Sequence, residues 1–310
     1  MRLVVIIAII AAAAVVPLFA GEFWVTLVTQ MMIFGLLALS ADFLLGNTGL
    51  FSLCHASFFA VSAYATAILQ VRHGVPTLIA APAGILTGTL LAMIFAFSVR
   101  TRGVYFILIT IAFGYIIWGV AYRWASFTGG DNGVTNVPYP SAGGWAITNS
   151  FQYYYLVLVA VLLCVWAYSV LVSSPFGLAL RGIKSSEPRL RSLGFDVSRH
   201  LYVAFVLSGM LASIAGVLYV YHNRFINPAA ASFPVSVEAV LMAIVGGSGT
   251  ILGPLIGSGL ILLLRNWVSG YFHFYHGILG IVFIATVLWA PKGLMGLITR
   301  WQSGDRGEGA

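Results

Sequence analysis

The sequence of 310 residues has little charge. Only 7% of its residues are charged, whereas 60% are hydrophobic and the mean hydropathy is +1.00. A soluble domain has about 25% charged and about 45–50% apolar residues. Most of this chain therefore cannot face water, and the composition predicts an integral membrane protein.

Cysteine and reactive motifs are scarce too. Cys54 and Cys164 are the only cysteines, and both fall within apolar runs, which favours neither a disulfide framework nor a metal site. The chain has no G-x-x-x-x-G-K-[ST] phosphate-binding sequence and no nucleophile elbow. We therefore predict no catalytic residue, metal or cofactor. Any energy-requiring process in which this chain takes part must draw its energy from another subunit or an ion gradient.

About ten apolar runs approach the roughly 20 residues that a helix needs to cross a bilayer. They show no period-two alternation, so we expect an all-α bundle and not a closed barrel. The prediction is one transmembrane domain over 1–300 with a polar tail at 301–310. The first run lacks a convincing cleavage site, which indicates a retained helix and not a signal peptide. The runs are 3–20, 23–45, 50–71, 76–98, 104–124, 151–172, 201–222, 235–249, 251–267 and 275–290.

The basic residues are unequally divided between the loops. With the N-terminus inside and ten crossings, eleven of the fifteen Lys and Arg residues are cytoplasmic and four are not. Cytoplasmic loops of membrane proteins carry this excess. The segment 174–200 and both termini are then cytoplasmic, whereas 125–149, which has no Lys or Arg, is outside. The net charge of +7 therefore reflects topology and does not indicate a nucleic-acid partner.

The segment 174–200 concentrates charge. Ser174 and Pro175 suit the N-cap and first position of a helix over 175–185, and a second short helix after Glu187 can end at Gly194. Its basic residues are Arg181, Lys184, Arg189, Arg191 and Arg199.

Two interpretations of this segment are open. Its positive charge could attract anionic lipid headgroups, or the segment could dock on a cytoplasmic partner. Only Phe176, Leu180 and Ile183 share an apolar face in 175–185, which is narrow for a lipid-facing helix and favours docking.

Glycines mark two further segments, Gly46 with Gly49, and Gly246 and Gly247 with Gly249. They could serve close helix packing, as could the small pairs Ala56 with Ala60 and Gly253 with Gly257. They could instead break a helix and expose backbone to a cavity, as in transporters. The run 235–249 is short and follows Pro234, which is consistent with a half-helix.

Ionisable residues inside apolar runs require a partner or water. Asp42, Glu238 and His55 are therefore candidates for pathway or helix-break residues. His222 and Arg265 also lie in or beside apolar runs. For the two histidines, a structural hydrogen bond is the simpler explanation.

The charged segment resembles the cytoplasmic coupling loop of ABC importer permeases of the LivM type, which serve branched-chain amino acids. The resemblance lies in "FG.ALR.I" at 176–183, then Glu187, then "RSLG" at 191–194. Two alanines of the family pattern are replaced by Arg189 and Leu190, whereas Gly194 matches. Further motifs follow in family order, "LLGNTGLFSLCHASFFAVSAYATAIL" at 44–69, "RTRGVYFILITIAFG" at 100–114, "TGGDNGV" at 128–134, "GGSGTILGPLIGSGL" at 246–260 and "APKGLMGL" at 290–297.

The resemblance implies a permease subunit in a bacterial inner membrane. Its implied partners are a second homologous permease, two cytoplasmic ATP-binding subunits and a periplasmic substrate-binding protein. The implied cargo is a branched-chain or other hydrophobic amino acid, with urea or a short amide as the alternative. An ion-coupled secondary transporter is a second class, and it predicts paired buried charges along a route through the membrane.

Overall fold

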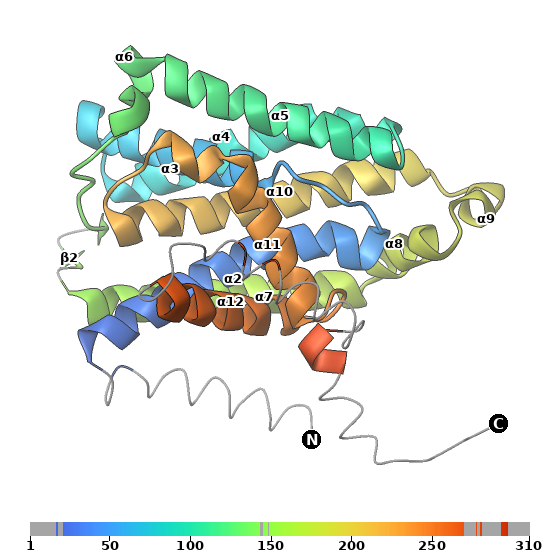
Figure 1. Ribbon diagram of the computed structural model, residues 1–310. Helices are drawn as coiled ribbons and strands as arrows, with labels where there is room; N and C mark the ends of the chain where they lie inside the picture. The colour runs from blue at the N-terminus through green and yellow to red at the C-terminus, as the bar shows by residue number, and fades with distance from the viewer. Residues whose placement is uncertain are drawn as a thin grey trace.

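The chain folds as a bundle of helices that run roughly along one axis, with α11 crossing them (Figure 1). Within the part of the chain that the structure describes, strands are limited to one antiparallel pair, β1 (Ser141–Ala142) and β2 (Trp145–Ala146). The predicted all-α class is confirmed. The computed structural model describes Pro17, residues 21–142, 145–147 and 149–269, Gly277, Gly280 and residues 293–296.

The helices follow one another with short connections. In chain order they are α2 (Glu22–Thr48), α3 (His55–His73), α4 (Thr77–Phe95), η1 (Ala96–Arg100), α5 (Val104–Arg123), α6 (Ala125–Thr128), η2 (Gly130–Asn132), α7 (Ser150–Ser173), α8 (Pro175–Ser185), α9 (Glu187–Ser192), α10 (Val197–Asn223), η3 (Pro228–Ala231), α11 (Phe233–Gly246) and α12 (Gly253–Ser269).

Among the residues that the structure describes, five helical segments are long and apolar enough to cross a membrane, namely α2, α4 with η1, α5, α7 and α10. The remaining predicted runs correspond to shorter or more polar helices, of 19 residues in α3, 14 in α11 and 17 in α12. The runs 3–20 and 275–290 and the tail 301–310 lie almost wholly outside the described residues. The number of ten crossings therefore stays a prediction.

α10 lies at the centre of the packing, in contact with α2, α3 and α4. Glycine permits this close approach. A Cβ atom at Gly216 of α10 would lie 2.0 Å from the backbone oxygen of Phe59 in α3, and one at Gly88 of α4 would lie 2.2 Å from Ser213 Oγ of α10. Because lipid gives apolar helices little reason to associate, such small residues supply the close packing instead.

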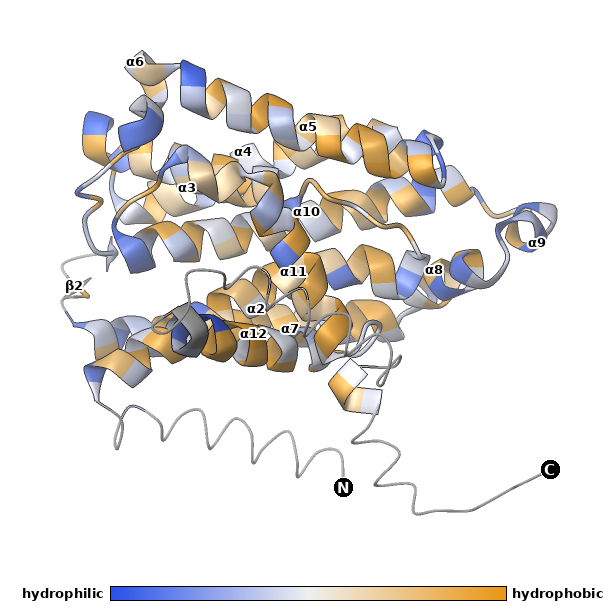
Figure 2. Ribbon diagram, in the orientation of Figure 1, coloured by the Kyte–Doolittle hydropathy of each residue, from blue (hydrophilic) through white to orange (hydrophobic). Residues whose placement is uncertain are grey.

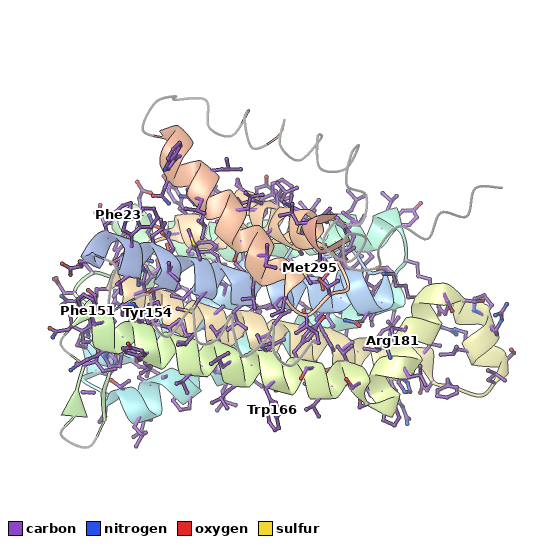
Figure 3. All side chains as sticks on the ribbon, turned by 90° about the horizontal axis from the view of Figure 1, so that it is seen from below. Phe23, Phe151, Tyr154, Trp166, Arg181 and Met295 are labelled. Carbon is purple, nitrogen blue, oxygen red and sulfur yellow. The ribbon has the colours of Figure 1, made fainter. Side chains whose placement is uncertain are left out.

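The outer helices α4, α5 and α7 consist largely of hydrophobic residues (Figure 2), and many of their apolar side chains are exposed. Leu86, Tyr105 and Trp166 are exposed by 62%, 74% and 66%, and Figure 3 shows Trp166 pointing outward from α7. A surface of this kind fits lipid or an apolar partner and would be unfavourable in water.

The first predicted break lies between α2 and α3. α2 ends at Thr48, Gly49 adopts a left-handed φ of 77°, and the chain stays non-helical until His55. This backbone is bonded within the protein, because Leu53 N donates to Thr110 Oγ1 at 3.2 Å. Non-helical backbone at membrane depth is tolerated where protein buries it. Gly46 itself is helical, so the break begins at Gly49 and not at Gly46.

The second predicted break lies between α11 and α12. α11 is a half-helix of 14 residues that ends at Gly246, and Gly247 and Gly249 then take φ angles of 119° and 80°. The returning helix packs closely, since a Cβ atom at Gly257 would lie 1.9 Å from Met242 O. Helix breaking and close glycine packing, which the sequence left as alternatives, therefore occur together here.

The segments 125–149 and 174–200 lie at opposite ends of the bundle (Figure 1). The first segment is hydrogen-bonded to the chain just after α10. Val134 N donates to Ile226 O at 2.8 Å, and Ile226 N donates to Val134 O at 3.0 Å. Figure 3 places Phe151 at one end and Arg181 at the other. The arrangement is the one that the topology requires, whereas the choice of cytoplasmic end stays a prediction.

Single cysteines test this arrangement in a background without the two buried free thiols, Cys54 and Cys164. Cysteines placed at Ser186 and at Ser141 should react with a membrane-impermeant maleimide from opposite faces, with Ser186 on the cytoplasmic side. The measurement is labelling of intact cells against inverted vesicles. Labelling of both positions from one face would contradict the ordering of the helices in the membrane.

Candidate functional site

α8 begins as the sequence predicted. Pro175 is its first residue, and Ser174 caps it by accepting a hydrogen bond from Gly177 N at 3.4 Å. Proline at this position loses no helical bond, because the first N–H groups of a helix have no partner in the helix itself. The short helix therefore has a defined start directly after α7.

α9 ends at a glycine, also as predicted. Gly194 has φ of 85°, its N–H bonds to Arg191 O at 3.0 Å, and Phe195 N bonds to Leu190 O at 3.1 Å. These two bonds form the Schellman arrangement that closes a helix through a left-handed residue. The conformation of Gly194 thus fixes where the chain turns from α9 toward α10.

α8 uses its apolar face within the protein. Ala179, Leu180 and Ile183 are buried, and α8 contacts α2, α7 and α10. Arg181 Nη1 donates to Val172 O at the end of α7 over 2.8 Å. Because the face is already occupied by the bundle, it is unavailable for insertion into lipid.

Arg189 and Leu190, which stand where the coupling-loop pattern has two alanines, have different surroundings. Leu190 is partly buried against α8, where a Cβ atom at Gly182 would lie only 2.9 Å from Leu190 Cδ1. Gly182 therefore leaves room for Leu190, whose side chain is larger than that of alanine. Arg189 is exposed to solvent on α9.

Glu187 joins α9 to a neighbouring loop. Its Oε1 atom pairs with Arg102, just before α5, and with Arg191 Nε at 2.9 Å. The Glu187 side chain is only 17% exposed, whereas the two arginines are half exposed. Glu187 therefore orients α9, and the basic side chains around it remain accessible.

α8 and α9 together form a helical hairpin, here called the hairpin. Its α9 end projects beyond the rest of the bundle (Figure 1). Leu193 is 68% exposed and Phe195 45% exposed, and Leu178 on α8 is 65% exposed. Leu193 and Phe195, with Arg189 and Arg191, make up the exposed end of the α9 segment, here called the hairpin tip, which combines apolar and basic groups. Exposed apolar side chains rimmed by charge are typical of a protein-binding surface.

Behind the hairpin, Lys184 points toward the bundle and not toward the tip. Its Nζ atom donates to Gly46 O at 2.8 Å, and the Lys184 Cγ atom would lie 3.4 Å from a Cβ atom at Gly49. α8 is thereby bonded to the last turn of α2.

The last turn of α2 in turn touches the turn between α11 and α12. A Cβ atom at Gly46 would lie 2.6 Å from Gly249 N and 2.7 Å from Gly249 Cα, closer than side-chain carbon atoms approach backbone. Asp42, one helical turn earlier, accepts from Gly249 N at 2.9 and 3.1 Å through its two carboxylate oxygens. The two glycine-rich segments, 200 residues apart in the chain, therefore meet at one point.

Asp42 is completely buried there. Besides this contact with backbone, Tyr168 Oη of α7 donates to Asp42 Oδ2 at 3.5 Å, and Asn47 donates to the same Tyr168 Oη at 3.1 Å. The carboxylate thus has a polar partner, one of the two environments that its position in an apolar run requires.

These contacts form a series, from Lys184 on α8, through Gly46 and Asp42 on α2, to Gly249 after α11. We call this series the inner contact. No step of it requires a reactive group, because each link is a hydrogen bond or a van der Waals contact with backbone. The arrangement connects α8, through the last turn of α2, to the turn behind α11.

Two of the predicted residues lie elsewhere. His55 Nε2 and Ser208 Oγ are 2.7 Å apart, and Ser208 Oγ donates to Ser40 O at 2.6 Å, which gives the histidine a structural hydrogen bond. Glu238 pairs with Arg265 at 3.4 Å, away from the inner contact. Gly246 and Gly247 shape the turn after α11 without touching Asp42.

Sequence reasoning missed several partners. Tyr168, Arg102 and Ser236 were not candidates, although Ser236 Oγ accepts from Ala56 N in the first turn of α3 at 3.1 Å. Tyrosine and serine in apolar helices carry no distinctive pattern, and Arg102 counted only toward topology. The spacing of residues along one chain contains no signal for contacts over such separations.

Comparison with known proteins gives the arrangement a context. Residues 23–287 match the family described as the permease component of branched-chain amino acid transport systems. The high-affinity branched-chain amino acid transport system permease protein LivM, from Salmonella typhimurium and from Escherichia coli, is 26% identical over 314 residues, which covers 94% of this chain and 74% of each relative. The corresponding permease protein LivH of E. coli is 24% identical over 303 residues, covering 87% of this chain and 93% of LivH.

The family match spans most of the chain and includes the helices that build the inner contact and the charged hairpin. Its extent agrees with the apolar spans and with the order of the motifs. This chain belongs to the family of branched-chain amino acid transport system permease components, and it is a membrane permease of an ABC importer.

Proposed function

We propose that this chain is one of two homologous permease subunits that together enclose a route for branched-chain amino acids across a bacterial inner membrane. Two cytoplasmic ATP-binding subunits drive the importer, and a periplasmic binding protein delivers the cargo. The chain itself performs no catalysis. Support for the paired permease comes from E. coli, in which both LivM and LivH are similar to this chain.

The observation that carries the proposal is the projecting hairpin with the inner contact behind it. The hairpin tip offers Leu193, Phe195 and the basic side chains of α9 to a partner, and Lys184 bonds the same hairpin to α2. A push on the hairpin by an ATP-binding subunit would thus reach the α11–α12 turn through the last turn of α2. We assign this end of the bundle to the cytoplasm, in agreement with its concentration of Lys and Arg.

Docking on protein accounts for the hairpin better than docking on lipid. Membrane-surface helices bury an apolar face in the headgroup region, but that face of α8 is buried in the bundle. The exposed Leu193 and Phe195 follow directly after α9, the helix that projects farthest from the spans (Figure 1). Basic groups that flank an apolar contact favour an acidic, grooved protein surface.

The cargo is tested by reconstituting the whole importer in liposomes with its binding protein. ATP-dependent uptake of radiolabelled leucine is expected, without uptake of urea, because the similar permeases belong to branched-chain amino acid systems. A complex lacking the ATP-binding subunits is the control. Uptake of urea in place of leucine would contradict the proposed cargo and leave the importer assignment in place.

Gly194→Val tests the coupling role of the hairpin. Valine at a φ of 85° costs about 1–3 kcal/mol, and a Cβ atom there would have no neighbour within 4 Å, so the effect is conformational and not a clash. The chain should reach the membrane but lose copurification of the ATP-binding subunits or the ATP hydrolysis that loaded binding protein stimulates.

Gly194→Asn is the matched control for this variant, because asparagine tolerates the left-handed region. It should keep stimulated hydrolysis close to that of the unaltered protein. Normal transport by Gly194→Val would show that the hairpin is a charged belt on the lipid surface and not a coupling element.

Asp42 allows a separate test of the inner contact. Asp42→Asn keeps an oxygen that can accept from Gly249 N, so the complex should assemble with little loss of thermal stability. Asp42→Ala removes the acceptor and should cost about 1–3 kcal/mol, the range for an unpaired buried donor. Thermal unfolding of the purified complex measures both, and failure of Asp42→Asn to insert would mean that the charge itself is structural.

A further inference from the structure

Two helices of the bundle each carry a single charged residue, and these two residues pair with each other. Glu238 is the one charged residue in the sequence of α11, and Arg265 is the one in α12. Arg265 Nη1 lies 3.4 Å from Glu238 Oε1. The other three ion pairs among the described residues all involve the segment 174–200. This one alone lies between apolar helices.

Helix packing does not require the pair. α11 and α12 already touch through backbone, where a Cβ atom at Gly246 would lie 1.8 Å from Gly253 O and one at Gly257 would lie 1.9 Å from Met242 O. Two charges placed in apolar helices are unfavourable unless they serve a purpose, and such residues commonly mark a substrate or ion route. The pair therefore calls for a role beyond joining the two helices.

The geometry leaves the two groups accessible. Their contact of 3.4 Å is longer than the roughly 2.7–2.9 Å of a tight charge-assisted hydrogen bond. The Arg265 side chain is 38% exposed and that of Glu238 is 18% exposed. A guanidinium has five N–H donors in a planar fork, and this contact uses one of them. A second anion can therefore approach the other N–H donors of Arg265 without first breaking a tight ion pair.

An apolar wall lies beside the pair. Val235 and Leu241, one turn to either side of Glu238 on α11, are partly buried. Opposite charges and aliphatic side chains are thus adjacent on α11 and α12.

We propose that Glu238 and Arg265 form a subsite for the charged end of an amino acid during its passage. Arg265 binds the α-carboxylate, Glu238 binds the α-ammonium group, and the aliphatic side chain lies against Val235 and Leu241. The inference rests on the function proposed above and adds to it the residues that recognise the cargo.

Binding at this subsite would exchange one pair of charged partners for another, which makes the subsite chemically reasonable. Before the amino acid arrives, each charge faces the other, and afterwards each faces the oppositely charged group of the zwitterion. No charge is left unpaired at either stage, which avoids the penalty that a lone charge suffers away from water. Bidentate binding by the guanidinium fork suits a carboxylate in particular. An uncharged cargo such as urea would gain nothing from the pair.

The test uses the whole importer in liposomes and measures radiolabelled leucine uptake and ATP hydrolysis in the same vesicles. Arg265→Gln should reduce leucine delivered per ATP by on the order of tenfold or more, the effect of losing one charge-assisted hydrogen bond. Hydrolysis stimulated by the loaded binding protein should persist. Arg123→Gln, which removes an exposed arginine at the end of α5, is the matched control and should transport normally.

A charge exchange separates recognition from structural pairing. In the double variant Glu238→Arg with Arg265→Glu, a simple clamp between α11 and α12 is restored, and normal uptake would overturn the proposal. A subsite predicts low uptake with normal assembly, because carboxylate and ammonium would have to trade places relative to the aliphatic side chain. Normal uptake by Arg265→Gln would overturn it as well.

Arg265→Lys covers the case in which Arg265→Gln fails to assemble. Lysine keeps the charge and loses the fork, so an assembled complex with reduced uptake per ATP supports the subsite, whereas loss of assembly in both variants shows a structural clamp. Leucine uptake by the unaltered complex reports on the proposed function independently. The proposed function and the proposed subsite would therefore be contradicted by different measurements.

Discussion

The contact between Gly46 and Gly249 is the constraint on which the inner end of the bundle depends. Neither residue has a side chain, and the distances leave no room for one at Gly46. That closeness brings Gly249 N within reach of both Asp42 oxygens and leaves Gly46 O open to Lys184. One backbone contact thus connects three parts of the chain, the end of α2, the turn after α11 and the charged hairpin.

The rest of the architecture holds this contact in place on two sides. α10 contacts α2 and packs closely against α3 and α4 through glycines, while the hairpin is anchored by buried apolar residues of α8 and oriented by Glu187. A rigid centre with a projecting tip allows a displacement at the tip to be transmitted instead of absorbed. Packed interiors respond to such displacements as discrete units and deform little within themselves.

Much of this arrangement was predictable from the sequence, because the relevant signals are local. Apolar runs predicted helices, Ser174 with Pro175 predicted the start of α8, and Gly194 predicted the end of α9, since caps and left-handed residues act within one turn. The shortness of α11 followed from Pro234 and from the length of its run. Pairings over long separations did not follow. The meeting of Asp42 with Gly249, and of Glu187 with Arg102, depends on how helices pack, which no local pattern encodes. The break between α2 and α3 was expected, but Gly46 proved to be a packing residue within the helix.

The contact between Leu190 and Gly182 has a consequence for the evolution of the hairpin. The two helices α8 and α9 are spaced by the combined volume of these two side chains, and this chain places nearly all of that volume on α9. A relative with alanine at the position of Leu190 has space for a larger residue at the position of Gly182 without a change in helix spacing. Side-chain size at the two positions should therefore vary inversely among homologues, and a change at one of them alone would tilt α9 and the surface that it carries.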